Sequence, residues 1–153
     1  MMETDAADTD SSSLRWQQRL AKFEEVLGWA TSIGSTRSER MTQLERQGLV
    51  HVFEHCHELA CQCLRDYFRW QGVHNLHGPK DAIREAFSRG LIQDGEAWID
   101  LNACRSMALK SYQGGITDAL CSRIQDQFLP LMLQLIRELE PRASAWKKRS
   151  VTV

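Results

Sequence analysis

Three residues near the end of one predicted helix have side chains suited to phosphodiester chemistry. Arg105, Lys110 and Tyr112 lie close together in the sequence, and Arg105 and Tyr112 are about two helical turns apart. A guanidinium matches phosphate geometry and stays charged, so Arg105 is suited to stabilise a phosphodiester as it is cut. Lysine is ordinarily protonated at neutral pH, so Lys110 is better suited to bind phosphate than to accept a proton.

A second chemistry, zinc binding, is suggested by histidines and a cysteine in residues 51–61. His57-Glu58-Leu59-Ala60-Cys61 differs from a zinc-hydrolase motif by a cysteine in place of the second histidine. His51 and His55 are four residues apart, so they share a helix face, and zinc accepts both ligand types. The sequence holds no second ligand cluster. We therefore expect partly exposed histidines beside core cysteines, and neither a metal nor another cofactor.

Apolar residues recur at three- and four-residue spacing, the pattern of amphipathic helices. The sequence predicts helices at about residues 13–33, 38–70 and 117–140, one more carrying Trp98 in the core, and a short one around 80–90. Ser13 is the expected N-cap of the first helix, and Pro130 is expected to kink the last. No segment alternates as a strand does. The expected fold is an all-α, antiparallel, up-and-down bundle of four main helices plus one short helix.

Composition and charge fit one globular domain of 153 residues, with 42% hydrophobic and 25% charged residues. We expect a bundle over residues 13–140, a disordered tail at 1–12 and a flexible basic tail at 141–153. A net charge of -1 gives no reason to expect DNA binding, and no apolar run is long enough for a membrane span. Five cysteines without disulfide spacing indicate the reducing cytoplasm.

Short motifs follow one another in a fixed order along the predicted helices. They begin with Phe53-Glu54 and Glu58-Leu59-Ala60, continue through residues 79–98, and end with Arg105, Tyr112 and Phe128-Leu129-Pro130. In order and spacing these motifs resemble those of the nucleotidyltransferase substrate-binding proteins, a branch of the HEPN superfamily. The resemblance spans about residues 14–140.

This resemblance implies a HEPN-like bundle that forms a homodimer and binds a cognate minimal nucleotidyltransferase in a two-component, toxin–antitoxin-like complex. Some members are metal-independent endoribonucleases, and their partner adenylylates the motif tyrosine, which here is Tyr112. The resemblance also implies catalytic positions for Arg105 and Lys110. It implies supporting positions for Glu54, Glu58 and Ser106.

Two positions depart from the active motif of that family. Ser106 replaces an asparagine, and Lys110 replaces a histidine, the residue that most readily exchanges protons near neutral pH. Two functions therefore stay open. The first is a non-catalytic or weakly catalytic subunit that binds the nucleotidyltransferase, and the second is an active ribonuclease regulated at Tyr112. The apolar run 128–133 exceeds one buried helix face, which favours a homodimer in either case.

Overall fold

The computed structural model describes residues 3–33, 35–110 and 118–151, with side chains described at 11–33, 35–106 and 118–145. Within these ranges the regular structure is entirely helical. The α-helices are α1 (Glu3–Ile33), α2 (Gln43–Trp70), α3 (Pro79–Ser88), α4 (Gly95–Lys110), α5 (Asp118–Arg123) and α6 (Leu129–Val151). A 3-10 helix at Ser38–Arg40 precedes α2, and a π-helical turn at Ile124–Phe128 joins α5 to α6.

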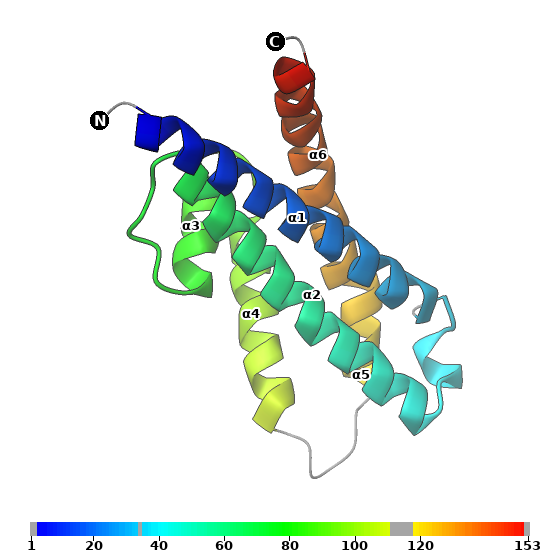
Figure 1. Ribbon diagram of the computed structural model, residues 1–153. Coiled ribbons are helices and arrows are strands. Elements are labelled where there is room, and N and C mark those ends of the chain that lie inside the picture. The colour runs from blue at the N-terminus through cyan, green and yellow to red at the C-terminus, as the bar shows by residue number, and fades with distance from the viewer. Residues whose placement is uncertain (1–2, 34, 111–117, 152–153) are drawn as a thin grey trace.

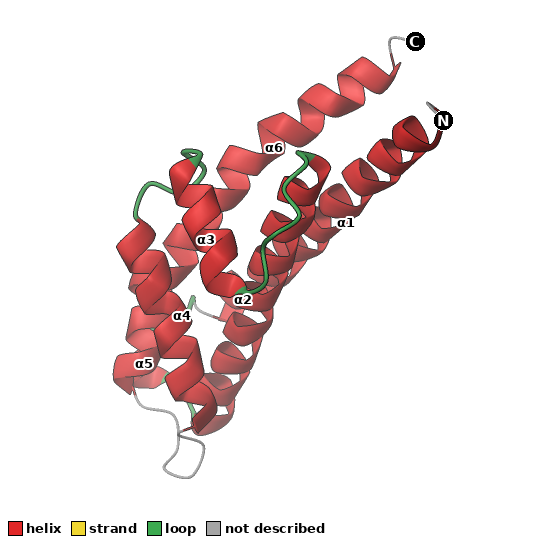
Figure 2. Ribbon diagram, turned by 90° about the vertical axis from the view of Figure 1, so that its left-hand side faces the viewer, coloured by secondary structure: helices red, strands yellow, loops and turns green. Residues whose placement is uncertain are grey.

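The helices form an antiparallel up-and-down bundle (Figures 1 and 2). Helices α1 and α2 run side by side in opposite directions, and α6 packs against α1. Helix α4 lies on the other side of α2, with the short α3 beside its first turns. Because α5, the π-helical turn and α6 are continuous, the described chain has four main helices and one short one. The predicted fold class is confirmed.

Helix α2 lies at the centre because its buried face is wide. It contacts α1, α3, α4 and α5, and its start is fixed by Thr42, whose hydroxyl accepts a hydrogen bond from the Glu45 backbone N–H at 3.2 Å. The predicted stripe of α1 is also confirmed. Its residues Trp16, Leu20, Phe23, Leu27 and Ala30 are buried. Trp98 of α4 is 2% exposed, as expected of a core residue.

Two predicted helix starts are wrong. Helix α1 begins at Glu3, so Ser13 is not an N-cap; it lies buried inside the helix and accepts a hydrogen bond from Gln17 Nε2 at 3.2 Å. The second helix starts at Gln43 rather than near Ser38, because the chain is extended at Met41 and at Thr42, which is the N-cap. At the first helix, a serine with the chemistry of an N-cap led to the wrong start.

The last helix is irregular just before Pro130, where a kink was predicted. The Leu129 backbone N–H donates to the Ile124 carbonyl, a π-type bond that widens the turn preceding the proline. This widening makes room for a ring that clashes with the preceding turn of a regular helix. Helix α6 then continues through the exposed Pro141 rather than ending near Glu140.

Helical backbone therefore extends past both predicted edges of the bundle, at residues 13 and 140. The first turns of α1 and the last turns of α6 project from the same end of the molecule (Figure 2). The division into a bundle and two tails stays a prediction. No helix in the described ranges has an apolar stretch that could cross a membrane.

Candidate functional site

A polar pocket of about 250 Å³ lies between α2 and α4. Four of its lining residues come from two turns of α2, namely His51, Glu54, His55 and Glu58, and the fifth is Arg105 of α4. Positions 51, 54, 55 and 58 share one side of a helix because they follow the three- and four-residue spacing. Packing α4 against this side places a guanidinium beside two carboxyl groups and two imidazoles.

Arg105 is half-buried, and its Nε atom has no hydrogen-bond partner although it is shielded from solvent. No ion pair ties its guanidinium to a carboxylate in the described part of the chain. A buried donor without a partner costs free energy, and a bound ligand can supply the missing acceptor. Arg105 is therefore poised to bind an anionic or hydrogen-bond-accepting group.

Glu54 faces the same region, and its Oε1 atom is likewise buried without a partner. Burial raises the pKa of Glu54 above its ordinary value, while the positive charges of Arg105 and His51 partly oppose that rise. The carboxyl group thus takes up a proton more readily than a solvated glutamate. The ionised form of Glu54 is stabilised by the nearby positive charges, of which that of Arg105 has the larger effect.

His57 lies one position from Glu58 in the sequence but is fully buried. Burial lowers the pKa of His57 to about 4, and the charge of Arg105 acts in the same direction. Its Nδ1 has no partner, and Nε2 lies 3.9 Å from Cys61 Sγ. Burial raises the pKa of the Cys61 thiol to about 12, so both side chains are neutral core groups. No group of three metal-binding side chains occurs among the residues described.

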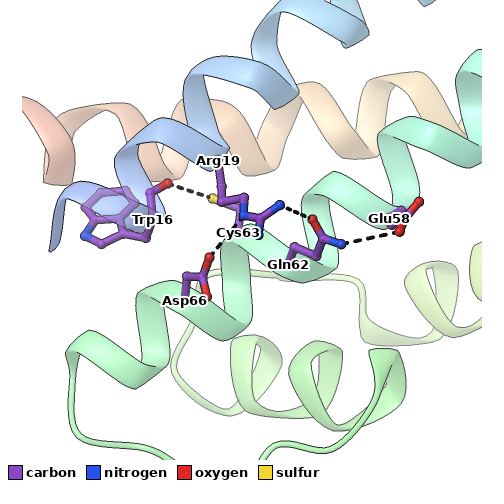
Figure 3. A network of polar contacts seen from close by, with 6 residues as sticks. All are labelled: Trp16, Arg19, Glu58, Gln62, Cys63 and Asp66. Carbon is purple, nitrogen blue, oxygen red and sulfur yellow. Dashed lines mark hydrogen bonds and ion pairs between the residues drawn. The ribbon is translucent and has the colours of Figure 1, made fainter. Parts of the chain in front are cut away.

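Glu58 is tied to helix α1 through a polar network (Figure 3). Gln62 Nε2 donates to Glu58 Oε1 at 3.3 Å, and Gln62 Oε1 accepts from Arg19 Nη1 of α1. Arg19 Nε also pairs with Asp66 Oδ2 at 3.3 Å. The carboxylate of Glu58 is thereby linked to α1 through Gln62 and Arg19.

The structure brings three of the predicted site residues together and separates a fourth from them. Arg105, Glu54 and Glu58 line one pocket, but Ser106 is exposed and its hydroxyl donates to the Asn102 carbonyl at 3.2 Å within α4. Lys110 is the last residue of α4, and its side chain lies outside the described residues. Tyr112 lies outside them altogether.

His51 and His55 are pocket residues that the sequence connected only with zinc. Both are exposed and open to solvent. Their spacing with Glu54 and Glu58 was a usable signal, since all four fall on one helix side. What the spacing did not show was that Arg105, about fifty positions later, packs against that side.

Comparison with known proteins places the chain in a protein family. The model of the family described as nucleotidyltransferase substrate binding protein like matches residues 15–141. The chain belongs to this family. The match covers α1 from Arg15 onward, all of α2 to α5 and much of α6, so it includes the whole pocket of Arg105.

The fold of this chain also occurs in a solved structure. A protein from Thermus thermophilus, known from its crystal structure, aligns with a TM-score of 0.61 and 22% identity. The alignment covers 79% of this chain and 98% of the Thermus chain. At this identity the likeness is one of fold. No curated protein matches the chain.

Proposed function

We propose that this chain is a HEPN-type subunit that binds a cognate minimal nucleotidyltransferase in a two-component, toxin–antitoxin-like complex in the cytoplasm. The observation that carries the proposal is the family match over residues 15–141. The five buried, unpaired cysteines are in keeping with a reducing compartment. The motif that in related proteins cuts RNA is altered here at Ser106 and Lys110, which favours binding over catalysis as the main role.

A groove between α3 and α4 supports partner binding. It has a volume of about 820 Å³ and is lined by Ile83, Phe87 and Ile99 together with Arg84 and the acidic Asp94, Glu96 and Asp100. Phe87 is 55% exposed, and its ring lies against Gly95. An exposed aromatic ring in an apolar groove is typical of an interaction surface.

Co-expression tests the proposal directly. The nucleotidyltransferase encoded beside this gene is expected to co-purify with the chain as a stable complex. Phe87→Ser is expected to weaken that complex, whereas Leu44→Ser, at a leucine that is 79% exposed on α2, serves as the matched control. No nucleotidyltransferase gene beside this one, or no complex between the two proteins, would contradict the proposed function.

We also propose a homodimer, although most of the apolar run 128–133 is used within the chain. Phe128, Leu129 and Met132 are buried in the core. The apolar surface that remains for a second copy is Pro130, part of Leu131, and Leu133, which is 38% exposed. Light scattering at tens of micromolar checks the mass, and Leu133→Glu is expected to shift it toward the monomer.

A second function, metal-independent RNA cleavage regulated by adenylylation of Tyr112, is favoured by one specific observation. The pocket of Arg105 contains His51 and His55, and histidine is the residue type most often used as a general acid or base in catalysis. Incubation with the neighbouring nucleotidyltransferase and ATP is expected to add the mass of AMP to the wild type. Tyr112→Phe, the control that lacks the acceptor hydroxyl, is expected to stay unmodified.

A further inference from the structure

We propose that His51 and His55 of α2 are the proton-transfer residues for RNA cleavage in the pocket of Arg105, in place of the histidine missing at position 110. This inference rests on the second proposed function. It differs from what the sequence motif implies, in which the reacting groups all lie in α4 and just after it. Here the acid–base groups come from one helix and the phosphate-binding group from another.

The positions of the two histidines support this role. They are separated by one helical turn, which sets their Cβ atoms about 6 Å apart, and both line the pocket that contains Arg105. Both are exposed, so a chain as large as RNA can reach them. The charge of Arg105 also acts on His57, but this residue is fully buried in the core and therefore cannot contact a substrate.

Two residues that line the pocket each have a polar atom without a partner within the chain. Arg105 Nε and Glu54 Oε1 are both buried without partners, one a donor and the other an acceptor. A phosphodiester oxygen can accept from Arg105, and the ribose hydroxyl beside it can donate to Glu54. Glu58 Oε1 already accepts a hydrogen bond from Gln62, so part of the hydrogen-bonding capacity of this carboxyl group is used within the chain.

The reaction balances without a metal or a second substrate. One imidazole, neutral, takes the proton of the 2′-hydroxyl as the 2′-oxygen forms its bond to phosphorus. The P–O5′ bond breaks, and the other imidazole, protonated, gives its proton to the departing 5′-oxygen. Arg105 stabilises the charge on the phosphorus oxygens during the exchange. The products are a 2′,3′-cyclic phosphate and a 5′-hydroxyl end.

A divalent cation at the same two histidines is the competing interpretation. The spacing His51-x-x-Glu54-His55 matches a helical zinc motif in which the glutamate is a base. The guanidinium of Arg105 in the same pocket opposes a divalent cation by charge repulsion, whereas it attracts a phosphate. The carboxyl groups of Glu54 and Glu58 act in the opposite direction, so the EDTA arm of the test below decides between the two ligands.

The test is cleavage of a single-stranded RNA oligonucleotide of mixed sequence with EDTA present. The wild type is expected to produce cyclic-phosphate ends, with a bell-shaped pH dependence because one imidazole must be neutral and the other protonated. The charged groups facing the histidines are Glu54 and Glu58 of α2 and Arg105 of α4. His51→Gln and His55→Gln are each expected to lower the rate about 100-fold or more. His74→Gln, at an exposed histidine of the loop before α3, is the matched control.

A second measurement separates failure of the inference from failure of the ribonuclease proposal. Histidine ring signals are followed by NMR as a 2′-O-methyl RNA oligonucleotide, which cannot be cut, is added; those of His51 and His55 are expected to shift and that of His74 to stay. Cleavage that survives in both histidine variants, or is lost only in Lys110→Ala, overturns the inference and leaves the ribonuclease standing. No cleavage by the wild type overturns both, and EDTA-sensitive cleavage assigns the histidines to a metal.

Discussion

The charge of Arg105 lowers the cost of burying the ionised carboxyl group of Glu54 although no ion pair joins the two residues. Their buried Nε and Oε1 atoms both lack hydrogen-bond partners, and the charge of Arg105 opposes the rise that burial causes in the pKa of Glu54. The two residues come from helices α4 and α2 and meet at the pocket that also contains two histidines. The effect of Arg105 on the pKa of Glu54 can be measured.

Removing the guanidinium is expected to raise the pKa of Glu54 further. In Arg105→Ala the burial of Glu54 persists while the favourable charge is lost, so protonation becomes easier. The pKa of His57 is expected to rise as well, because Arg105 contributes to lowering it. NMR titration of the Glu54 carboxyl carbon checks the first effect. Arg105→Lys keeps the charge and should leave the titration close to that of the wild type; an unchanged pKa in Arg105→Ala would show that the two residues do not interact.

His57 is expected to make the fold less stable in mild acid. The unfolded chain takes up a proton on this residue near pH 6.5, whereas the folded chain resists until about pH 4. Below pH 6.5 the unfolded state therefore binds more protons, and stability falls as the pH drops toward 4. The full loss is on the order of 3 kcal/mol.

Urea unfolding between pH 7 and 4.5 measures this loss. Glu54 acts with the opposite sign, because a raised pKa makes the folded state bind the extra proton. Comparing the wild type with His57→Leu isolates the histidine, since Glu54 is present in both. The variant is expected to show a flatter pH dependence; two parallel curves would mean that His57 does not contribute.

Much of the fold was predictable because apolar spacing reports directly on which helix face is buried. Trp16, Phe23 and Ala30 recur at regular intervals, and each is fully buried. Helix ends were harder to place. Ser13 has the chemistry of an N-cap, but its hydroxyl accepts a hydrogen bond from the Gln17 side chain inside α1. The residues before it form no apolar stripe, so periodicity could not show that the helix starts at Glu3.

The site was predictable only in part because it depends on contact between distant segments. Glu54, Glu58 and Arg105 were connected through a resemblance to a family, and the structure places them in one pocket. His51 carried no such connection to Arg105. The contact between α2 and α4 follows from packing of the whole bundle, which local spacing does not encode.

Truncation of Phe128 is expected to destabilise the bundle by about 3–5 kcal/mol. Its ring is 1% exposed and stacks on that of Phe53, with centroids 5.5 Å apart. Phe128→Ala removes that contact at the π-helical turn and leaves a cavity between α2 and the last helix. Thermal unfolding checks the loss against Leu44→Ala, which should be near neutral at a residue that is 79% exposed. Equal effects of the two changes would place Phe128 outside the core.

The last helix should contribute to stability beyond Glu140, where the bundle was first expected to end. Arg142 Nη1 donates to the Tyr67 hydroxyl at 3.1 Å, and the guanidinium lies 5.9 Å from the centre of the same ring. A double-mutant cycle with Tyr67→Phe and Arg142→Ala isolates the hydrogen bond from the packing of the ring. We expect a coupling free energy of about 0.5–1.5 kcal/mol, which about 0.5 M NaCl reduces only slightly because a hydroxyl carries no charge to screen. A coupling indistinguishable from zero would mean that α6 after Pro141 does not hold its position against α2, and would restore the shorter bundle.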